Sequence, residues 1–414
     1  MKRVIILGGG TISHVRNHLA LCAPAYGGTA KELYWRCNKK FENMFVNKIT
    51  TKMVDSGSAI ETPEDVEAYV DKLIQDNTTK VVFFNVAMVD FKGYVEGGVS
   101  GKYGARLRTR DNHNLSIQLT PYHKVVSKIR QKRKDIFLVA FKTTCGATKA
   151  EQFAAGLNLL KESSCNLVLA NDTATHSNII ITPEEGSYDF DTDRSKALSE
   201  LVEMAWHRTH LSFTRSTVLD GQPVPWNDQR VYPALREVVN FCINRGAYKK
   251  FRGVTTGHFA AKLSPNHFLT SIRKTNFNDI GSNGMVEVKT DGPDNVLSFG
   301  AKPSVGGQSQ RIIFDKYKDL DCIVHFHCPL KEGAKDIPVV SQREYECGSH
   351  ECGQNTADGL KEIWPGIYCV MLDKHGPNIV FNHNIDPYTV TAFIDKYFDL
   401  TKSTSGFEQV YLGV

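Results

Sequence analysis

The sequence predicts an α/β protein of two domains, in which a parallel sheet covered by helices precedes an α+β domain. A chain of 414 residues is too long for one compact core. Up to about residue 210, apolar runs alternate with amphipathic segments, a pattern typical of a parallel sheet. Leu219–Asp228, rich in proline, glycine and aspartate, then reads as a linker. The predicted domains are residues 1–215 and 228–414.

The first domain is predicted to be Rossmann-like. Its expected strands are five apolar runs: Val4–Leu7, Val81–Asn85, Phe137–Phe141, Leu167–Ala170 and Ile179–Thr182. Helical periodicity covers Pro63–Gln75, Ala150–Glu162 and Arg194–Arg208. Thr62 stands before a first-turn proline and two acids, as at many helix starts. Because the first run ends at glycines, we expect a buried strand that enters a tight loop.

The second domain has a different order of elements. A helix at Arg230–Arg245 ends at Gly246, and short strands separated by turns follow. The remaining expected elements alternate between helix and strand: Gln308–Lys318, Cys322–Phe326, Gln354–Ile363 and Ile367–Leu372. This mixture predicts an antiparallel sheet flanked by helices.

Composition narrows the class of protein. The net charge of +5 is small, and the basic run Lys128–Lys134 has no interleaved aromatic residues, so nucleic acid is not the expected partner. Ten irregularly spaced cysteines are typical of reduced thiols in a cytosolic protein. No stretch approaches the roughly 20 apolar residues that cross a bilayer, and the first apolar run is too short for a signal peptide. We therefore expect a cytoplasmic protein that does not bind a membrane.

Gly8-Gly9-Gly10-Thr11 follows the first predicted strand. Because glycines have no side chains, a phosphate could approach the backbone N–H groups of this segment closely. The complete G-x-G-x-x-G spacing is absent, so a simple tight turn is the alternative interpretation.

Several segments follow one another along the chain in an order that resembles the order of motifs in the phosphopantothenate–cysteine ligases. They are Gly9–Thr11 with Val15-Arg16, Gly27–Ala30, Asn85–Phe91, Pro121 with Lys124, Phe141-Lys142 and Leu169–Asp172. The resemblance covers residues 1–210 and implies a ligase that joins a carboxylate to an amine through an acyl-nucleotide. It also implies CTP or ATP with magnesium as cosubstrate.

The ligase resemblance assigns roles to individual residues. Asn171 would hold the activated acyl group, and a larger set would bind nucleotide or phosphate: Gly9, Gly10, Thr11, Asp90, Lys102, Arg106 and Lys124. The alternative interpretations are a turn that ends a strand for Asn171-Asp172 and a solvated helix face for Lys124. The chain departs from the family where Thr144-Cys145 replaces an expected Glu-Thr, so an acid is missing.

Two histidines, His325 and His327, lie two residues apart on a predicted strand and project from one face. His375 follows the strand Tyr368–Leu372, which we expect to end nearby. Three neutral histidines with an open fourth position are the arrangement of catalytic zinc. The alternatives are a merely polar strand end and a rival zinc site made of Cys347, His350 and Cys352.

Residues 230–414 resemble class II aldolase/adducin domains. The matching segments are Thr255–His258, Lys302–Ser304, Val324–His327 and His375-Gly376. The resemblance implies that Thr256, Gly257 and Ser304 bind phosphate. It implies zinc, or another divalent metal, on the three histidines, where the metal steadies an enediolate in aldol cleavage, epimerisation or dehydration. Both resemblances imply a homo-oligomer.

The acid/base glutamate of the aldolases should stand near Gly306, where the sequence has no carboxylate. Dehydratases of this superfamily place a glutamate after the metal strand, which makes Glu346 or Glu351 the candidate; the alternative is a pair of surface helix acids. Tyr411 corresponds to a tail tyrosine that related aldolases lend to a neighbouring subunit, although a tail aromatic is more often packing or disorder.

Two functions follow. The first is a bifunctional metabolic enzyme, a nucleotide-dependent carboxylate–amine ligase joined to a zinc-dependent lyase, that acts on a small phosphorylated or carboxylated metabolite. The second is a catalytically degenerate scaffold or assembly protein that keeps its nucleotide and metal. The missing acids favour the second function, whereas the three histidines and Asn171 favour the first.

Overall fold

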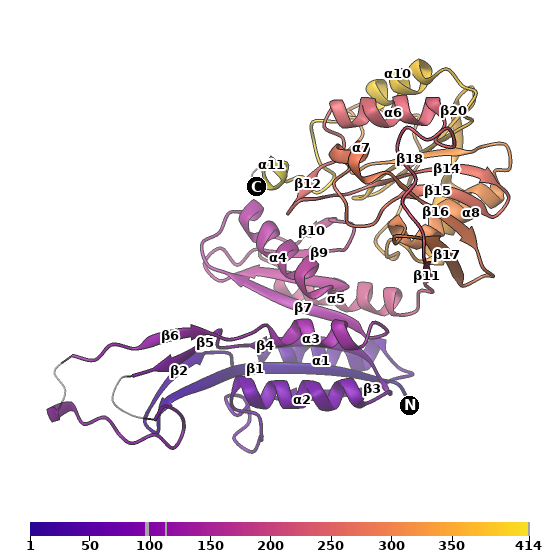
Figure 1. Ribbon diagram of the computed structural model, residues 1–414. Coiled ribbons are helices and arrows are strands. Elements are labelled where there is room, and N and C mark those ends of the chain that lie inside the picture. The colour runs from indigo at the N-terminus through magenta and orange to yellow at the C-terminus, as the bar shows by residue number, and fades with distance from the viewer. Residues whose placement is uncertain (96–98, 112–113, 413–414) are drawn as a thin grey trace. The chain divides into compact units, whose positions relative to one another are not determined.

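The computed structural model describes residues 1–95, 99–111 and 114–412 (Figure 1). The chain forms two compact units. The first unit consists of Met1–Ala147, Ala155–Ile181 and Asp189–Thr209. The second contains His210–Val414 and two short segments from earlier in the sequence, Thr148–Ala154 and Thr182–Tyr188. None of the helices in the described part of the chain has the length and apolarity that crossing a bilayer requires.

The first unit is built on a sheet whose strand order is β10-β9-β8-β7-β4-β1-β2, with β3 beside β1. Its parallel centre comprises β1 (Arg3–Arg16), β3 (Phe45–Thr50), β4 (Thr79–Ala87), β7 (Phe137–Thr144) and β8 (Leu167–Asp172). The remaining strands are β2 (Leu19–Ala23), β9 (Asn178–Ile181) and β10 (Ser187–Asp189). This parallel sheet confirms the predicted α/β class.

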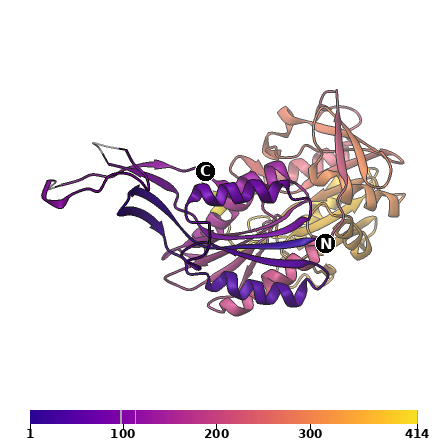
Figure 2. The ribbon, with the colours of Figure 1, turned by 90° about the horizontal axis from the view of Figure 1, so that it is seen from below.

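Helices lie on both faces of that sheet (Figure 2). The helices are α1 (Gly28–Lys40), α2 (Pro63–Gln75), α3 (Val125–Lys132), α4 (Lys149–Ser163) and α5 (Arg194–Thr209). Helix α1 packs with α5, and α2 packs with α3. Helix α2 has the bounds that its sequence predicts, because Thr62 Oγ1 accepts a hydrogen bond from Asp65 N, and the Asp65 carboxylate accepts one from Thr62 N.

Strand β1 does not end at the glycines, so the predicted tight loop after Leu7 was wrong. The strand continues through Gly8–Gly10 to Arg16. A Cβ on Gly8 would lie 2.3 Å from Ala30 Cβ, and one on Gly10 would lie 2.1 Å from the Ala23 carbonyl oxygen. The glycines therefore let α1 and β2 approach the strand closely.

An antiparallel arm extends from the first unit (Figure 1). It combines the second half of β1, β2, β5 (Phe91–Tyr94) and β6 (Gln118–Pro121), in which β5 pairs with β6 and β1 with β2. Phe91, Tyr94 and Leu119 on the arm are exposed.

The second unit is an α+β structure, as predicted. Its sheet has the order β11-β17-β16-β15-β14-β18-β22-β21-β19, with β20 beside β21. The strands are β11 (Arg215–Leu219), β14 (His258–Ser264), β15 (His267–Ser271), β16 (Met285–Thr290), β17 (Asn295–Phe299), β18 (Cys322–His325), β19 (Val339–Val340), β20 (Lys361–Trp364), β21 (Ile367–Leu372) and β22 (Gly376–Phe381). All pairs are antiparallel except β11–β17 and β19–β21.

Helices and short strands complete this unit. Helix α6 (Pro233–Asn244) packs with α10 (Pro387–Tyr397), and α8 (Gln308–Lys316) packs with α9 (His350–Gly359). The short elements are β12 (Lys250–Phe251), β13 (Val254–Thr255), α7 (Ile280–Asn283), η3 (Ser304–Gly307) and α11 (Gln409–Leu412).

The helix expected at Gln354–Ile363 is shifted. Helix α9 begins at His350 because Ser349 Oγ accepts a hydrogen bond from Cys352 N, and the residues after Gly359 form strand β20. The segment read as a linker is also ordered in part: Leu219 ends β11, and Val224 is buried and bridges to Met285.

Both faces of β18 are buried, and the core therefore holds the strand that carries the first two candidate ligands. Val324 packs in one apolar cluster with Phe259 and Phe326, whereas Ile323 packs in another with Val380. The strand is buried along its length up to His325.

Candidate metal centre

Three histidines converge at one end of β18. His325 is the last residue of β18, His327 lies two residues further on, and His375 lies in the turn between β21 and β22. Strand β22 pairs with β18 so that Asn378 lies opposite His325, which places the turn beside the end of β18. All three side chains are buried, and their ligand atoms lie within 4.8 Å of one another.

The His325 ring is oriented by the backbone. Its Nδ1 lies 2.7 Å from the Pro377 carbonyl oxygen, which can only accept, so Nδ1 carries the proton. Nε2 keeps its lone pair and lies 3.2 Å from His375 Nε2. Burial lowers the pKa of His325 to about 4, although the bond to Pro377 opposes the shift, so the ring is neutral at pH 7.

Thr404 holds the backbone of the other two histidines. Thr404 N donates to the His327 carbonyl at 3.1 Å, and Thr404 Oγ1 donates to the His375 carbonyl at 3.2 Å. A Cβ on Gly376, whose φ is +143°, would lie 2.0 Å from the Phe326 carbonyl oxygen. Only glycine therefore allows the turn to pack against the strand end.

These residues fit a divalent metal ion such as zinc. Neutral imidazoles are ordinary zinc ligands, and a ligating histidine typically donates its other ring N–H to a carbonyl, as His325 does here. Among the residues that the structure describes, the three histidines are the set of His, Cys, Asp or Glu that could hold a metal ion.

The rival cysteine site is not assembled within the described chain. His350 Nδ1 lies 2.5 Å from Gln308 Nε2, and its Nε2 lies 3.2 Å from Thr214 Oγ1. Cys352 Sγ lies 3.5 Å from Gln342 Nε2. His350 is thus turned toward polar side chains and does not share a ligand cluster with Cys347 and Cys352.

A fourth histidine, His258, lies beside the centre. It pairs with His325 across β14 and β18, and the two ring centroids are 4.8 Å apart. Its Nδ1 is buried without a hydrogen-bond partner among the described residues, and burial holds its pKa well below the usual value. From the sequence, His258 is predicted only as part of the segment Thr255–His258, which resembles a phosphate-binding loop.

The predicted phosphate residues lie near the same strand end. Gly257, with φ +108°, would place a Cβ 2.5 Å from the His325 carbonyl oxygen. Thr256 precedes it, and its buried hydroxyl has no hydrogen-bond partner in the described part of the chain. Ser304 Oγ instead accepts a hydrogen bond from Ser271 Oγ at 2.9 Å.

The two predicted acids have different environments. The Glu351 carboxylate accepts hydrogen bonds from Ser212 N at 3.0 and 3.2 Å, which fixes the backbone before β11. Glu346 is buried and precedes Cys347.

Sequence reasoning missed two further buried acids, Glu184 and Glu185. Their signal was the segment Thr182–Gly186, in which turn residues flank two adjacent acids directly after the predicted strand Ile179–Thr182.

Several candidate nucleotide residues of the first unit already have hydrogen-bond or ion-pair partners within the protein. Thr11 Oγ1 donates to the Ala87 carbonyl at 3.1 Å and accepts from Val89 N at 2.9 Å. Lys124 Nζ lies 2.7 Å from Asp90 Oδ1, and both side chains are exposed.

Lys102 Nζ lies 2.5 Å from Glu61 Oε2, and this hydrogen bond is the largest cause of the lowered pKa of Glu61. Arg106 is exposed.

Asn171 and Asp172 end strand β8. Asp172 accepts five hydrogen bonds, from Thr144 Oγ1, Gly146 N, Ala147 N, Ala174 N and Thr175 N. These bonds, the one from Thr175 N first, hold the pKa of Asp172 well below its usual value. Thr144, where the ligases have an acid, is therefore part of a loop closure, and Asn171 lies beside it.

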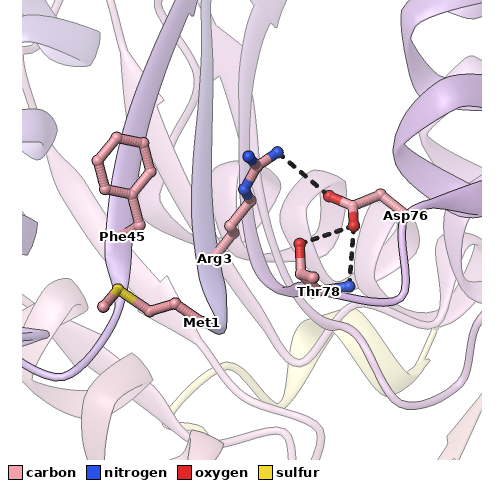
Figure 3. Close-up of a pocket in the computed structure, with 5 residues that line it drawn as sticks. All are labelled: Met1, Arg3, Phe45, Asp76 and Thr78. Atoms are coloured by element: carbon pink, nitrogen blue, oxygen red, sulfur yellow. Dashed lines mark hydrogen bonds and ion pairs between the residues drawn. The ribbon is translucent and has the colours of Figure 1, made fainter.

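A hollow of about 450 Å³ lies at the amino ends of the parallel strands, opposite the carboxyl end where Asn171 and Asp172 stand (Figure 3). Its lining is Met1, Arg3, Phe45, Asp76 and Thr78, and Arg3 Nη1 lies 3.5 Å from Asp76 Oδ2. These residues stand at or before the amino ends of β1, β3 and β4. Ligands of open α/β sheets bind at the carboxyl ends, so this hollow does not match the predicted nucleotide site.

Comparison with known families confirms both resemblances. Residues 236–386 match the family model of the class II aldolase and adducin N-terminal domain. The chain is 22% identical over 175 residues to the coenzyme A biosynthesis bifunctional protein CoaBC of Thermococcus kodakarensis. That alignment spans 41% of this chain and only 41% of the relative's length.

Two solved structures are each similar to part of the chain. The DNA/pantothenate metabolism flavoprotein of Streptococcus pneumoniae is 16% identical, with a TM-score of 0.41, and the match covers 50% of this chain and 99% of that one. YgbL of Escherichia coli is 18% identical, with a TM-score of 0.29, over 39% of this chain and 83% of that one.

Proposed function

We propose that this chain is a bifunctional metabolic enzyme. Its second unit is a metal-dependent lyase, epimerase or dehydratase that acts on a small phosphorylated or carboxylated hydroxycarbonyl compound. The observation that carries this proposal is the convergence of three buried imidazoles within 4.8 Å at the end of β18. The match of residues 236–386 to the class II aldolase and adducin family supports it.

His325, His327 and His375 would hold a zinc ion or another divalent metal. When bound, such a metal offsets the negative charge that develops on substrate oxygen as a carbon-bound proton or a carbon fragment leaves. The chain itself supplies buried imidazoles, orients the His325 ring through the Pro377 carbonyl and holds the His375 backbone through Thr404. The buried Thr256 hydroxyl is suited to donate a hydrogen bond to a phosphate or carboxylate of the substrate.

The first unit is proposed to be a nucleotide-dependent carboxylate–amine ligase that uses CTP or ATP with magnesium. The similarity to CoaBC supports this assignment. Asn171 is at the carboxyl end of β8, where ligands of parallel sheets bind. Lys102 and Lys124 would have to exchange their present carboxylate partners for phosphates.

Metal analysis and nucleotide binding test the two halves separately. The full-length chain, purified without chelator, is expected to contain about one divalent ion per chain, as three-histidine sites do. CTP or ATP with magnesium is expected to raise the thermal midpoint, since a ligand that binds the folded state stabilises it. A chain without metal after zinc loading would refute the lyase, and no shift with either nucleotide would refute the ligase.

A scaffold that binds both ligands without catalysis is the second candidate. The absence of a carboxylate near Gly306 and the ion pairs of Lys102 and Lys124 favour it. A scaffold metal should be structural, so its removal would unfold the second unit. A catalytic metal would leave the fold intact when removed.

A further inference from the structure

A second hollow, of about 230 Å³, lies in the second unit. It is bounded mainly by the turn between β14 and β15, the end of β16, helix α8 and the residue before β18. None of the site residues predicted from the sequence is among the described residues that line it. The charged residues of its lining are Lys262, His267, Arg311, Asp315, Lys318 and Asp321. The hollow is therefore a candidate ligand site in addition to the metal centre.

The hollow and the three histidines lie at opposite ends of the paired strands β14 and β18. His258, the first residue of β14, pairs with His325 at the end of β18. Further along β14, Lys262 N donates at 2.7 Å to the carbonyl of Asp321, the residue before β18. Because four residues of a strand span about 13 Å, a small ligand in the hollow would lie apart from the metal centre.

The ammonium group of Lys262 lies among residues that line the hollow. Its Nζ donates to the Lys318 carbonyl at 2.5 Å and lies 5.5 Å from the centroid of the Phe314 ring. A second hydrogen bond goes to the Tyr317 carbonyl at 3.4 Å. Burial lowers the pKa of Lys262, although the nearby Asp321 carboxylate opposes this shift. The acceptors of the ammonium group are thus neutral carbonyl oxygens, which leave its charge available to an anion.

Arg311 is a second cation of the lining that is held by neutral groups. Its guanidinium donates to the Gly292 and Pro293 carbonyls at 2.9 and 2.6 Å, and to Gln308 Oε1 at 3.0 Å. Only 8% of the residue is exposed. A guanidinium stays protonated in proteins, so its charge adds to the attraction that an anion in the hollow would feel.

The carboxylates of the lining already have partners. Asp321 Oδ1 accepts a hydrogen bond from His383 N at 2.7 Å, and Oδ2 pairs with the His383 ring. Asp315 Oδ1 lies 3.9 Å from Lys318 Nζ. His267 Nε2 lies 2.8 Å from a glutamate outside the lining. Among the described residues of the lining, the charge that remains after this pairing is positive.

A buried hydroxyl belongs to the same lining. Thr290 is the last residue of β16, and its Oγ1 has no hydrogen-bond partner in the part of the chain that the structure describes. A buried hydroxyl without a partner destabilises the fold, because its hydrogen bonds to water are lost and not replaced. A ligand oxygen that accepted this hydrogen bond would remove that penalty.

We propose that this hollow binds a small oxyanion, either a phosphate or a compact carboxylate. Lys262 and Thr290 donate to the anion, and Arg311 adds positive charge. Since a water molecule occupies about 30 Å³ in the liquid, the hollow has room for about seven or eight atoms of that size. Orthophosphate and a three-carbon dicarboxylate such as malonate match this size, whereas a nucleotide is too large.

Site-resolved acetylation of lysines tests the proposal. Full-length protein is labelled with an amine-reactive acetyl ester in chloride, orthophosphate or malonate at equal ionic strength, and each lysine is followed by mass spectrometry. At ten times the dissociation constant of the anion, labelling of Lys262 should slow about tenfold, since only the unliganded fraction reacts. Lys316, which lies on α8 outside the lining and pairs with Asp358, is the internal control and should label at one rate throughout.

A variant without the hydroxyl separates binding from folding. Thr290→Val should keep the thermal midpoint of wild type, because Oγ1 has no partner to lose in the described chain. Its affinity for the anion, read from the protection of Lys262, should fall about tenfold, as the loss of one charge-assisted hydrogen bond does. The matched control is Ser298→Ala, which removes a buried hydroxyl outside the lining and should bind the anion as wild type does.

A neutral probe tests the role of charge. Malonamide has nearly the size of malonate but no charge, and it should leave the labelling of Lys262 unchanged. Protection by orthophosphate alone would assign the hollow to phosphates, and protection by malonate alone would assign it to carboxylates. Protection by neither anion, equal protection by malonamide, equal slowing of Lys316, or wild-type affinity in a folded Thr290→Val would each overturn the proposal.

Discussion

The candidate site residues of the two units differ in how their polar groups are arranged. In the second, three imidazoles are buried with their ligand atoms within 4.8 Å of one another, and the Pro377 carbonyl orients the His325 ring. In the first, Asp90 pairs with Lys124, Lys102 pairs with Glu61, and Asp172 closes a loop with five donors. Buried side chains that converge and could bind the same metal ion are stronger evidence for a site than polar residues that already have partners within the protein.

The largest expected effect concerns His325. His325→Ala removes the one imidazole whose Nδ1 is anchored by Pro377, and zinc affinity should fall by at least about a hundredfold. Chelator competition with full-length protein measures it. His267→Ala, which alters a histidine paired with Glu287 on the same sheet, is the matched control and should bind zinc as wild type does.

Gly376→Ala is expected to have the next largest effect. Its Cβ would strike the Phe326 carbonyl at 2.0 Å, so the second unit should lose about 3 kcal/mol of stability, as severe backbone conflicts do. Urea unfolding followed by tryptophan fluorescence measures the loss. Gly281→Ala meets nothing within 4 Å and should change stability little; equal losses in both variants would show that the turn does not constrain His375.

Asp172 makes the stability of the first unit depend on pH. Its pKa is lowered in the folded state, so its contribution is present above the unfolded pKa of about 3.9 and is lost as the pH falls through and below that value. Asp172→Asn should lower the thermal midpoint at pH 7 and flatten its decline below about pH 4. An unchanged acid profile in the variant would contradict the loop-closing role.

The smallest effect on stability is expected at Lys124. Its pair with Asp90 is exposed, so Lys124→Ala should cost at most about 1 kcal/mol. If the first unit binds a triphosphate, the same variant should weaken CTP or ATP with magnesium about tenfold in calorimetry, as the loss of one charge-assisted bond does. Lys80→Ala, which removes a lysine paired with Asp135 at the amino end of β4, serves as the control and should bind the nucleotide as wild type does.

Local signals made much of the fold predictable. Helix α2 has a capping box and a first-turn proline, and β21 is an apolar run with turn residues at both ends, so both have the expected bounds. The spacing of His325 and His327 placed two imidazoles on one face, and the turn after β21 was the natural place for the third. The ligand atoms of all three do lie together.

Tertiary contacts explain what the sequence could not reveal. The glycines of β1 looked like a loop because their role, close approach of Ala30 and Ala23, depends on distant elements. Helix α9 begins early because Ser349 caps it, a signal overlooked among competing polar residues. Glu185 was missed because it lies more than a hundred residues before His325 and reaches the second unit only through folding.

X-ray absorption at the zinc edge of the metal-loaded, full-length protein tests the central claim most directly. If His325, His327 and His375 hold the ion, the first shell contains imidazole nitrogens at about 2.0 to 2.1 Å and shows the multiple scattering of their rings. A sulfur shell at about 2.3 Å would place the metal on cysteines and contradict the account.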